Sequence, residues 1–209
     1  LTMPVQSARV VSNLTIKNME KKIGAVLKAC EVRAIVELVK FLQVKLDNLY
    51  LIGVDCPGTF EVADYAKMVQ EGKGGELTKS QLKGMEKGGS PAPSGYAYRT
   101  ACQMCEYPVP KADIIFRLFG YPTEQEIGIE VGERLEKEIE EKGLLSYSEN
   151  EPASRGEVVN RVIADRTKKR DALFEEFKGV VKDLGSFMNR FSACIRCHNC
   201  MVACPICYC

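Results

Sequence analysis

The sequence has no excess of charge of either sign and no long apolar run. Its 29 basic and 28 acidic residues nearly cancel, which argues against a nucleic-acid partner held by bulk charge. No stretch approaches the roughly 18 consecutive apolar residues of a membrane-spanning helix, so we expect no integral membrane segment and a cytoplasmic protein. The first residues contain no apolar core of the signal-peptide type. Because the sequence also lacks an initiating methionine and ends within a group of cysteines, we expect a fragment.

Glycine-rich phosphate-binding motifs are also missing. The segment 71–99 is rich in Gly, Ser, Pro and Lys, but it contains no G-x-x-x-x-G-K-[ST] and no strand-linked G-x-G-x-x-G, so the spacing excludes a phosphate loop. We expect a long mobile loop here, since loops of this length are usually functional or disordered. A lid over a cofactor is the alternative.

What the sequence does contain is ten cysteines that fall into groups. Disulfide scaffolds are typically short secreted chains with cysteines spread through loops, whereas this chain is long and its charged segments are typical of cytosolic proteins. Grouped thiols in a reducing compartment more often hold metal. The candidate ligands are Cys30, Cys56, Cys102, Cys105, Cys194, Cys197, Cys200, Cys204, Cys207 and Cys209.

The last group has the spacing C-x2-C-x2-C-x3-C followed by proline, over residues 194–205. This run is typical of ferredoxin-type 4Fe–4S sites, whereas zinc usually takes two separated pairs of ligands. Two arrangements stay open: the four motif cysteines hold one cluster, or two clusters share the region with Cys207, Cys209 and ligands beyond the last residue. We favour the second, because the fourth cysteine of such a run can ligate the other cluster. His198, between two ligands, is expected to pack over the cluster or to donate to sulfur.

Upstream, short apolar runs alternate with a helical pattern. Residues 23–27 and 49–54 suit buried strands, and residues 31–42 have apolar side chains at helical spacing. Strand, helix and strand within about 30 residues predict a right-handed βαβ unit with parallel strands. We therefore expect the α/β class with a parallel-sheet domain.

Two lone cysteines follow the two predicted strands. Cys30 opens the predicted helix, and Cys56 comes directly after the second strand. The carboxyl ends of parallel strands form the ligand crevice of open α/β sheets, so we expect these thiols on one edge and near each other. Either cysteine alone would more often be buried and inert. With Cys102 and Cys105 they make four, and we expect them to bind one inner 4Fe–4S cluster.

Further along, residues 126–131 predict a strand and residues 132–145 a charged helix closed by Gly143. A long helical segment is expected to begin at a capping box of Ser154 and Glu157. Its basic run, residues 166–170, is expected to be a solvated face, with contact to an anionic coenzyme as the minor alternative. An apolar stripe that is expected to serve packing continues toward the cysteines: Leu173, Phe177, Val180, Val181, Leu184, Phe187, Met188 and Phe191.

These patterns predict three parts. Residues 1–150 would form an α/β domain, incomplete at its N-terminus, with the inner 4Fe–4S site. Residues 151–192 would form a helical arm that carries the last part away from this domain. Residues 193–209 would form a truncated ferredoxin-type 4Fe–4S module.

Four blocks of the sequence resemble the coenzyme F420 hydrogenase/dehydrogenase beta-subunit family. They are KKIGAVLKACEVRAIVEL, NLYLIGVDCPGT, RTACQMCEYPVPKADI and GIEVGERLEKEIEEKGLL, and the terminal CIRCHNCMVACPICYC is similar to the formate-dehydrogenase type of member. The likeness covers residues 20–145. The chain departs from the family in having ACE where Pro-Cys-Gln is frequent and VDC where Leu-Phe-Cys is usual.

The resemblance implies an iron–sulfur flavoprotein subunit with FAD and two or more 4Fe–4S clusters. Such a subunit moves electrons between coenzyme F420 and the catalytic subunit of a formate dehydrogenase or hydrogenase, or heterodisulfide reductase subunits. Flavin converts a two-electron hydride into single electrons, and we expect these to run from the inner cluster along the arm to the terminal clusters. Pro57, Gly58 and Thr59 are the candidate flavin contacts, because small residues at the carboxyl end of a strand permit close backbone approach.

Two other readings of the sequence remain. The first is an electron-relay, polyferredoxin-like subunit without its own coenzyme site. The second is a non-redox protein with structural iron–sulfur or zinc sites. The sequence identifies no catalytic residue.

Overall fold

The centre of the structure is a four-stranded sheet with the order β1-β2-β3-β4. The computed structural model describes all residues except 1, 4, 18–19, 90–91, 145–150 and 208–209. The strands are β1 Ile23–Leu27, β2 Leu49–Val54, β3 Ile114–Arg117 and β4 Gly128–Val131. β1 pairs with β2, and β2 with β3, in parallel, which confirms the predicted βαβ unit and the α/β class.

The sheet is mixed, so the prediction of a parallel-sheet domain is confirmed for β1, β2 and β3 but not for β4. β4 pairs antiparallel to β3, with Ile114 opposite Val131. Only residues 118–127 connect the two strands, and a parallel crossover needs roughly a dozen residues or more. The short connection therefore turns β4 back along β3.

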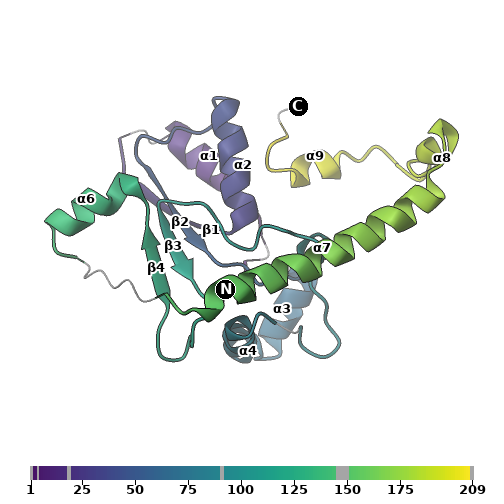
Figure 1. Ribbon diagram of the computed structural model, residues 1–209. Coiled ribbons are helices and arrows are strands. Elements are labelled where there is room, and N and C mark those ends of the chain that lie inside the picture. The colour runs from purple at the N-terminus through teal and green to yellow at the C-terminus, as the bar shows by residue number, and fades with distance from the viewer. Residues whose placement is uncertain (1, 4, 18–19, 90–91, 145–150, 208–209) are drawn as a thin grey trace.

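Helices α1 (Ala8–Lys17) and α2 (Ala29–Lys40) lie side by side against β1 and β2 (Figure 1). α2 begins directly after β1, as predicted, and buries the side chains that recur at helical spacing. Together these elements form the largest apolar core, which includes Ala8, Val11, Leu27, Val32, Ile35, Leu38 and Leu49. This core fixes the carboxyl ends of β1 and β2 relative to each other.

The segment expected to be a mobile loop contains a helix in its first half, so that expectation was wrong there. α3 (Val62–Gln70) precedes it, and α4 (Gly74–Glu86) occupies its first half. Leu77, Gln81 and Met85 recur every four residues on α4 and are all buried. The polar composition of the segment hides this one buried face, which is enough to hold an amphipathic helix.

The long helix α7 (Ser154–Val180) begins inside the α/β domain. Val158 and Val162 pack with Met85, Leu118 and Phe119 in a second core. The predicted capping box was wrong: Ala153 is the N-cap, and the Ser154 hydroxyl donates to the Gly120 carbonyl instead, 3.4 Å away.

The smaller elements are α5 Thr100–Gln103, α6 Glu133–Glu141, α8 Leu184–Asn189 and α9 Asn199–Ala203. Gly143, with φ 59°, follows α6 as predicted.

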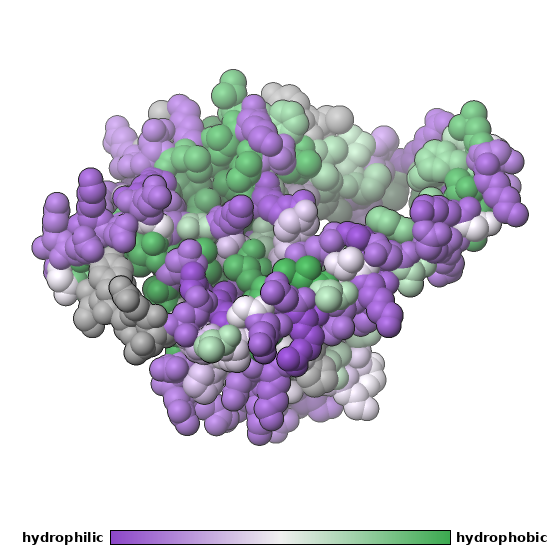
Figure 2. Space-filling view, in the orientation of Figure 1, coloured by the Kyte–Doolittle hydropathy of each residue, from purple (hydrophilic) through white to green (hydrophobic). Residues whose placement is uncertain are grey.

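The second half of α7 leaves the domain, and α8 lies at its far end (Figure 1). The apolar stripe expected to pack is largely exposed there, with Phe177 51% and Leu184 75% accessible, and apolar side chains gather at the tip (Figure 2). The chain then returns, so the expected separation of the terminal segment was also wrong. Arg9 donates to the carbonyls of Val202 and Cys207, at 3.2 and 3.4 Å.

A buried ion pair joins α7 to the sheet. Asp55, which follows β2, is 1% exposed and lies 2.7 Å from Arg155 Nη1. The Asp55 carboxylate also accepts the backbone N–H groups of Leu118 and Phe119, at 2.8 and 3.0 Å. Gly120 has a φ of 77°, and a Cβ there would lie 2.7 Å from the Arg155 backbone, so glycine permits this approach.

None of the described helices is long and apolar enough to cross a membrane.

We expect Arg155→Met to destabilise the fold by about 3–5 kcal/mol, because it leaves the Asp55 carboxylate buried without its counter-charge. Urea unfolding followed by circular dichroism measures the change. Arg117→Met is the control, since Arg117 pairs with the partly exposed Glu130 and Glu151 and such pairs contribute about 1 kcal/mol or less. Equal losses of unfolding free energy in the two variants would contradict the conclusion that the buried Asp55–Arg155 pair stabilises the fold more than the partly exposed pairs of Arg117.

Candidate metal centre

Four of the candidate cysteines line one cavity of about 210 Å³. Cys30 opens α2 after β1, Cys56 follows β2, Cys102 belongs to α5, and Cys105 lies just beyond it. The parallel pairing of β1 and β2 brings the first two to the same edge of the sheet, as their positions in the sequence suggested. The segment 99–108 brings the other two, because the Cys56 N–H donates to the Pro108 carbonyl at 2.8 Å.

The N-terminal segment forms one wall of this cavity, through Met3, Val5 and Gln6. Lys28 holds it in place, since its ammonium group donates to the Met3 carbonyl at 2.8 Å. Glu31, which is fully buried, accepts the Ser7 N–H at 2.7 Å and lies 3.0 Å from Lys28 Nζ. This buried pair was not predicted, although two charged residues flanking Cys30 in the sequence were a visible signal.

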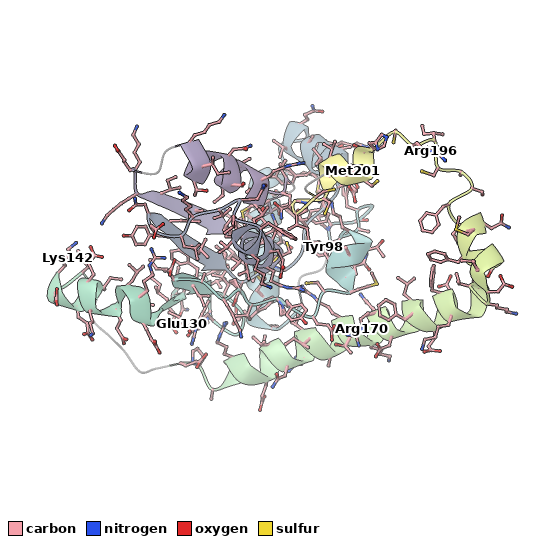
Figure 3. The ribbon with its side chains drawn as sticks, turned by 90° about the horizontal axis from the view of Figure 1, so that it is seen from above. Tyr98, Glu130, Lys142, Arg170, Arg196 and Met201 are labelled. Carbon is pink, nitrogen blue, oxygen red and sulfur yellow. The ribbon has the colours of Figure 1, made fainter. Side chains whose placement is uncertain are left out.

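Arg166 of α7 joins the two cysteine-bearing loops. Its guanidinium group donates to the carbonyls of Cys56, Pro57 and Cys105, at 3.2, 2.8 and 3.4 Å. Arg170, labelled on α7 in Figure 3, forms an ion pair with Glu106, one residue past Cys105. The expectation of a solvated basic run was therefore wrong for these two arginines, although the intervening lysines are exposed.

The helical spacing of residues along α7 could have predicted that Arg166 points into the domain. Arg155, Val158, Val162 and Arg166 recur at intervals of three and four residues, which places them on one helix face. The two valines are buried in the domain. The arginines at the ends of this apolar face must therefore also point into the domain, where they meet carbonyl and carboxylate groups.

The cavity strongly affects the acidity of its thiols. Burial raises the pKa of Cys56 to about 12. Burial also raises the pKa of Cys30, and the nearby Lys28 partly offsets this effect by favouring the thiolate. Both thiols are protonated near neutral pH in the metal-free chain, so metal binding must release their protons.

The donor set of the cavity has the chemistry of an iron–sulfur site. Among the described residues no three His, Cys, Asp or Glu side chains are close enough to hold one metal ion. In a cubane cluster each cysteine binds a different iron, so the four sulfurs lie farther apart than around one ion. Among the described residues that line the cavity, the cysteines are joined by no carboxylate and no histidine, and all-thiolate ligation is typical of 4Fe–4S sites.

The residues expected to contact flavin pack against the protein itself. Gly58 has a φ of 119°, and a Cβ there would lie 3.0 Å from Tyr98 Cδ1 and 3.4 Å from Cys102 Cβ. Thr59 lines the cysteine cavity, and Pro57 lines a neighbouring cavity of about 150 Å³. Both cavities are smaller than the roughly 300–1,000 Å³ typical of organic-ligand pockets.

The backbone of the terminal cysteine motif contains two residues in the left-handed conformation. Arg196 and His198, which flank Cys197, both have left-handed conformations with φ of 54° and 58°. Left-handed residues on both sides of Cys197 turn the chain sharply there. His198 is the N-cap of α9, and its Nδ1 lies 3.1 Å from the sulfur of Met201, labelled in Figure 3. Cys194, Cys197 and Cys200 are exposed, Cys204 and Cys207 are half-buried, and Cys209 lies outside the described residues.

Comparison with known proteins finds subunits of oxidoreductases. The chain is 29% identical, over 221 aligned positions, to the beta subunit of F420-dependent formate dehydrogenase 1 of Methanococcus maripaludis. It is 28% identical, over 222 positions, to the beta subunit of F420-dependent formate dehydrogenase of Methanocaldococcus jannaschii. These similarities confirm the resemblance expected from the sequence.

Each alignment covers 91% of this chain and 55% of the relative. The chain therefore spans about half the length of the curated relatives it matches. No family model matches the chain.

We expect Cys56 of the metal-free protein to react with iodoacetamide more slowly than the exposed Cys197, because only the thiolate is nucleophilic. The folded-state pKa of Cys56 lies above its usual value of 9.0, so its contribution to stability is complete below about pH 9 and is lost as the pH rises toward about 12. Mass spectrometry of alkylated peptides over this pH series, with parallel unfolding curves, measures both effects. Equal rates at Cys56 and Cys197 would contradict the burial.

Proposed function

We propose that this chain transfers electrons through iron–sulfur clusters in a protein similar to the beta subunits of F420-dependent formate dehydrogenases. The observation that carries this proposal is the convergence of Cys30, Cys56, Cys102 and Cys105, from three separate segments, on one cavity. These four cysteines are the proposed ligands of an inner 4Fe–4S cluster. Arg166 and Lys28 supply positive charge beside it, which favours thiolate ligands.

The terminal segment is proposed to hold a second site. Cys194, Cys197, Cys200 and Cys204 match the ferredoxin-type spacing, and the left-handed residues beside Cys197 support a tightly curved loop. Cys207 and Cys209 are proposed to serve a further cluster that shares this region. In terms of organisation, residues 1–150 form the proposed flavin or coenzyme domain, 151–192 the arm and 193–209 the ferredoxin-type module.

FAD is the proposed flavin, and coenzyme F420, which the names of both relatives mention, is the proposed two-electron substrate. Flavin supplies the exchange between a hydride and single electrons. Because the cavities beside Pro57, Gly58 and Thr59 are small, these residues would form one wall of a flavin site that other parts of the protein complete.

The proposed partner is the catalytic subunit of a formate dehydrogenase, since both relatives are named as subunits of that enzyme. Hydrogenase and heterodisulfide reductase subunits are further proposed partners, and the proposed location is the cytoplasm. The size of the cavities also favours a second function, an electron-relay subunit without a coenzyme site of its own.

We expect Cys56→Ala to lower the iron content by about four atoms per chain, one 4Fe–4S cluster. Anaerobic purification followed by iron and sulfide quantitation measures the loss. Met104→Leu is the matched control, because Met104 lies between the two cysteines of the C-x2-C pair and carries no proposed ligand role. Unchanged iron in Cys56→Ala would reject the inner cluster.

For the native protein with its partners, we expect near-stoichiometric FAD and reduction by F420 rather than by NAD(P)H. Flavin quantitation and anaerobic reduction assays with each donor test this expectation. Iron without flavin would favour the relay function. Visible absorbance that dithionite fails to bleach would identify structural metal sites instead.

A further inference from the structure

Two side chains in the wall of the cysteine cavity have a buried polar atom without a hydrogen-bond partner among the described residues, Thr59 through its Oγ1 and Arg99 through its Nε. Thr59 is 4% exposed, and its Oγ1 makes no hydrogen bond among the described residues. Arg99 also lines the cavity, and its Nε lies 3.3 Å from a carboxylate oxygen of Glu61. Within the described part of the chain, Thr59 therefore has the one orphan hydroxyl that borders the four thiols.

The backbone around Thr59 is held in place on both sides. The Thr59 carbonyl accepts the Arg99 N–H at 2.9 Å. The next residue, Phe60, is fully buried and stacks on Tyr98, with ring centroids 4.5 Å apart. On the other side, Gly58 packs against Tyr98 and Cys102. These contacts keep Thr59 buried in the wall of the cavity.

A buried hydroxyl without a partner costs free energy, and most such groups in native proteins have an explanation in an unseen partner. Thr59 lines the cavity, so a group bound there is the nearest candidate partner, and an acceptor on that group would use the hydroxyl proton. Acceptors of the right kind are the thiolate and sulfide sulfurs of a bound cluster.

We propose that the Thr59 hydroxyl donates a hydrogen bond to a sulfur of the inner cluster and thereby raises the reduction potential of that cluster. The inference rests on the proposed function, because it requires the cluster. Reduction places additional negative charge on the sulfurs, so a donor stabilises the reduced form more than the oxidised form. Thr59 is thus a positioning and tuning residue, and not a ligand.

The test compares Thr59→Val, which removes the hydroxyl at nearly constant shape, with Thr59→Ser, which keeps it. Redox titration of the anaerobic protein, followed by electron paramagnetic resonance, gives the potentials, and the signal absent from Cys56→Ala identifies the inner cluster. We expect a more negative potential in Thr59→Val, a nearly native one in Thr59→Ser, and native iron content in both.

Thr123→Val is the matched control, because Thr123 Oγ1 is also buried without a partner but does not line the cavity. Its potential should equal that of the wild type. In the metal-free protein both valine variants should be more stable than the wild type, since each removes an orphan hydroxyl.

An unchanged potential in Thr59→Val with full iron content would overturn this inference and leave the inner cluster intact. A wild-type protein without the inner-cluster signal would instead overturn the proposed function, and the inference with it. Should Thr59→Val fail to retain iron, the smaller pair Thr59→Ser and Thr59→Ala provides the same comparison, and equal potentials in that pair would overturn the inference.

Discussion

The buried pair of Asp55 and Arg155 fixes the start of α7, and the cysteine site depends on that helix. Asp55 directly precedes Cys56, so the residue that anchors α7 also determines where the second thiol lies. Eleven residues, or about 16 Å along the helix axis, separate Arg155 from Arg166. Because both arginines lie on the same face of α7, anchoring the first delivers the second to the carbonyls of Cys56, Pro57 and Cys105.

The four thiols come from three segments that have little affinity for one another without the surrounding fold. The β1–β2 pairing supplies two of them, and the segment after α4 supplies the C-x2-C pair. In the metal-free state burial keeps the Cys56 thiol protonated. In the proposed cluster, the charge that stabilises four thiolates would come from the metal and from the nearby Lys28 and Arg166, which are themselves held by buried or carbonyl contacts.

The sequence predicted the parts of the molecule that depend on local periodicity. Strands β1 and β2, the helix between them and the positions of Cys30 and Cys56 followed from apolar spacing alone. The direction of β4 depends on the length of the preceding connection. α4 was missed because its buried face consists of few residues within a polar segment. Arg166 was predicted to be solvated, but it binds backbone carbonyls of the cysteine loops. A basic run in the sequence does not show which carbonyl groups a distant loop will place beside it.

The return of the chain after α8 has a mechanical consequence. Met3, Val5 and Gln6 border the cavity. A few residues later, Arg9 donates hydrogen bonds to the carbonyls of Val202 and Cys207. Ile206 packs against the core that contains Ala8. Met3, Val5, Gln6 and Arg9 thus link the cavity of the first four cysteines to the terminal segment that carries Cys207. A displacement of these N-terminal residues would therefore open the cavity wall and, at the same time, break the contacts that hold the terminal segment.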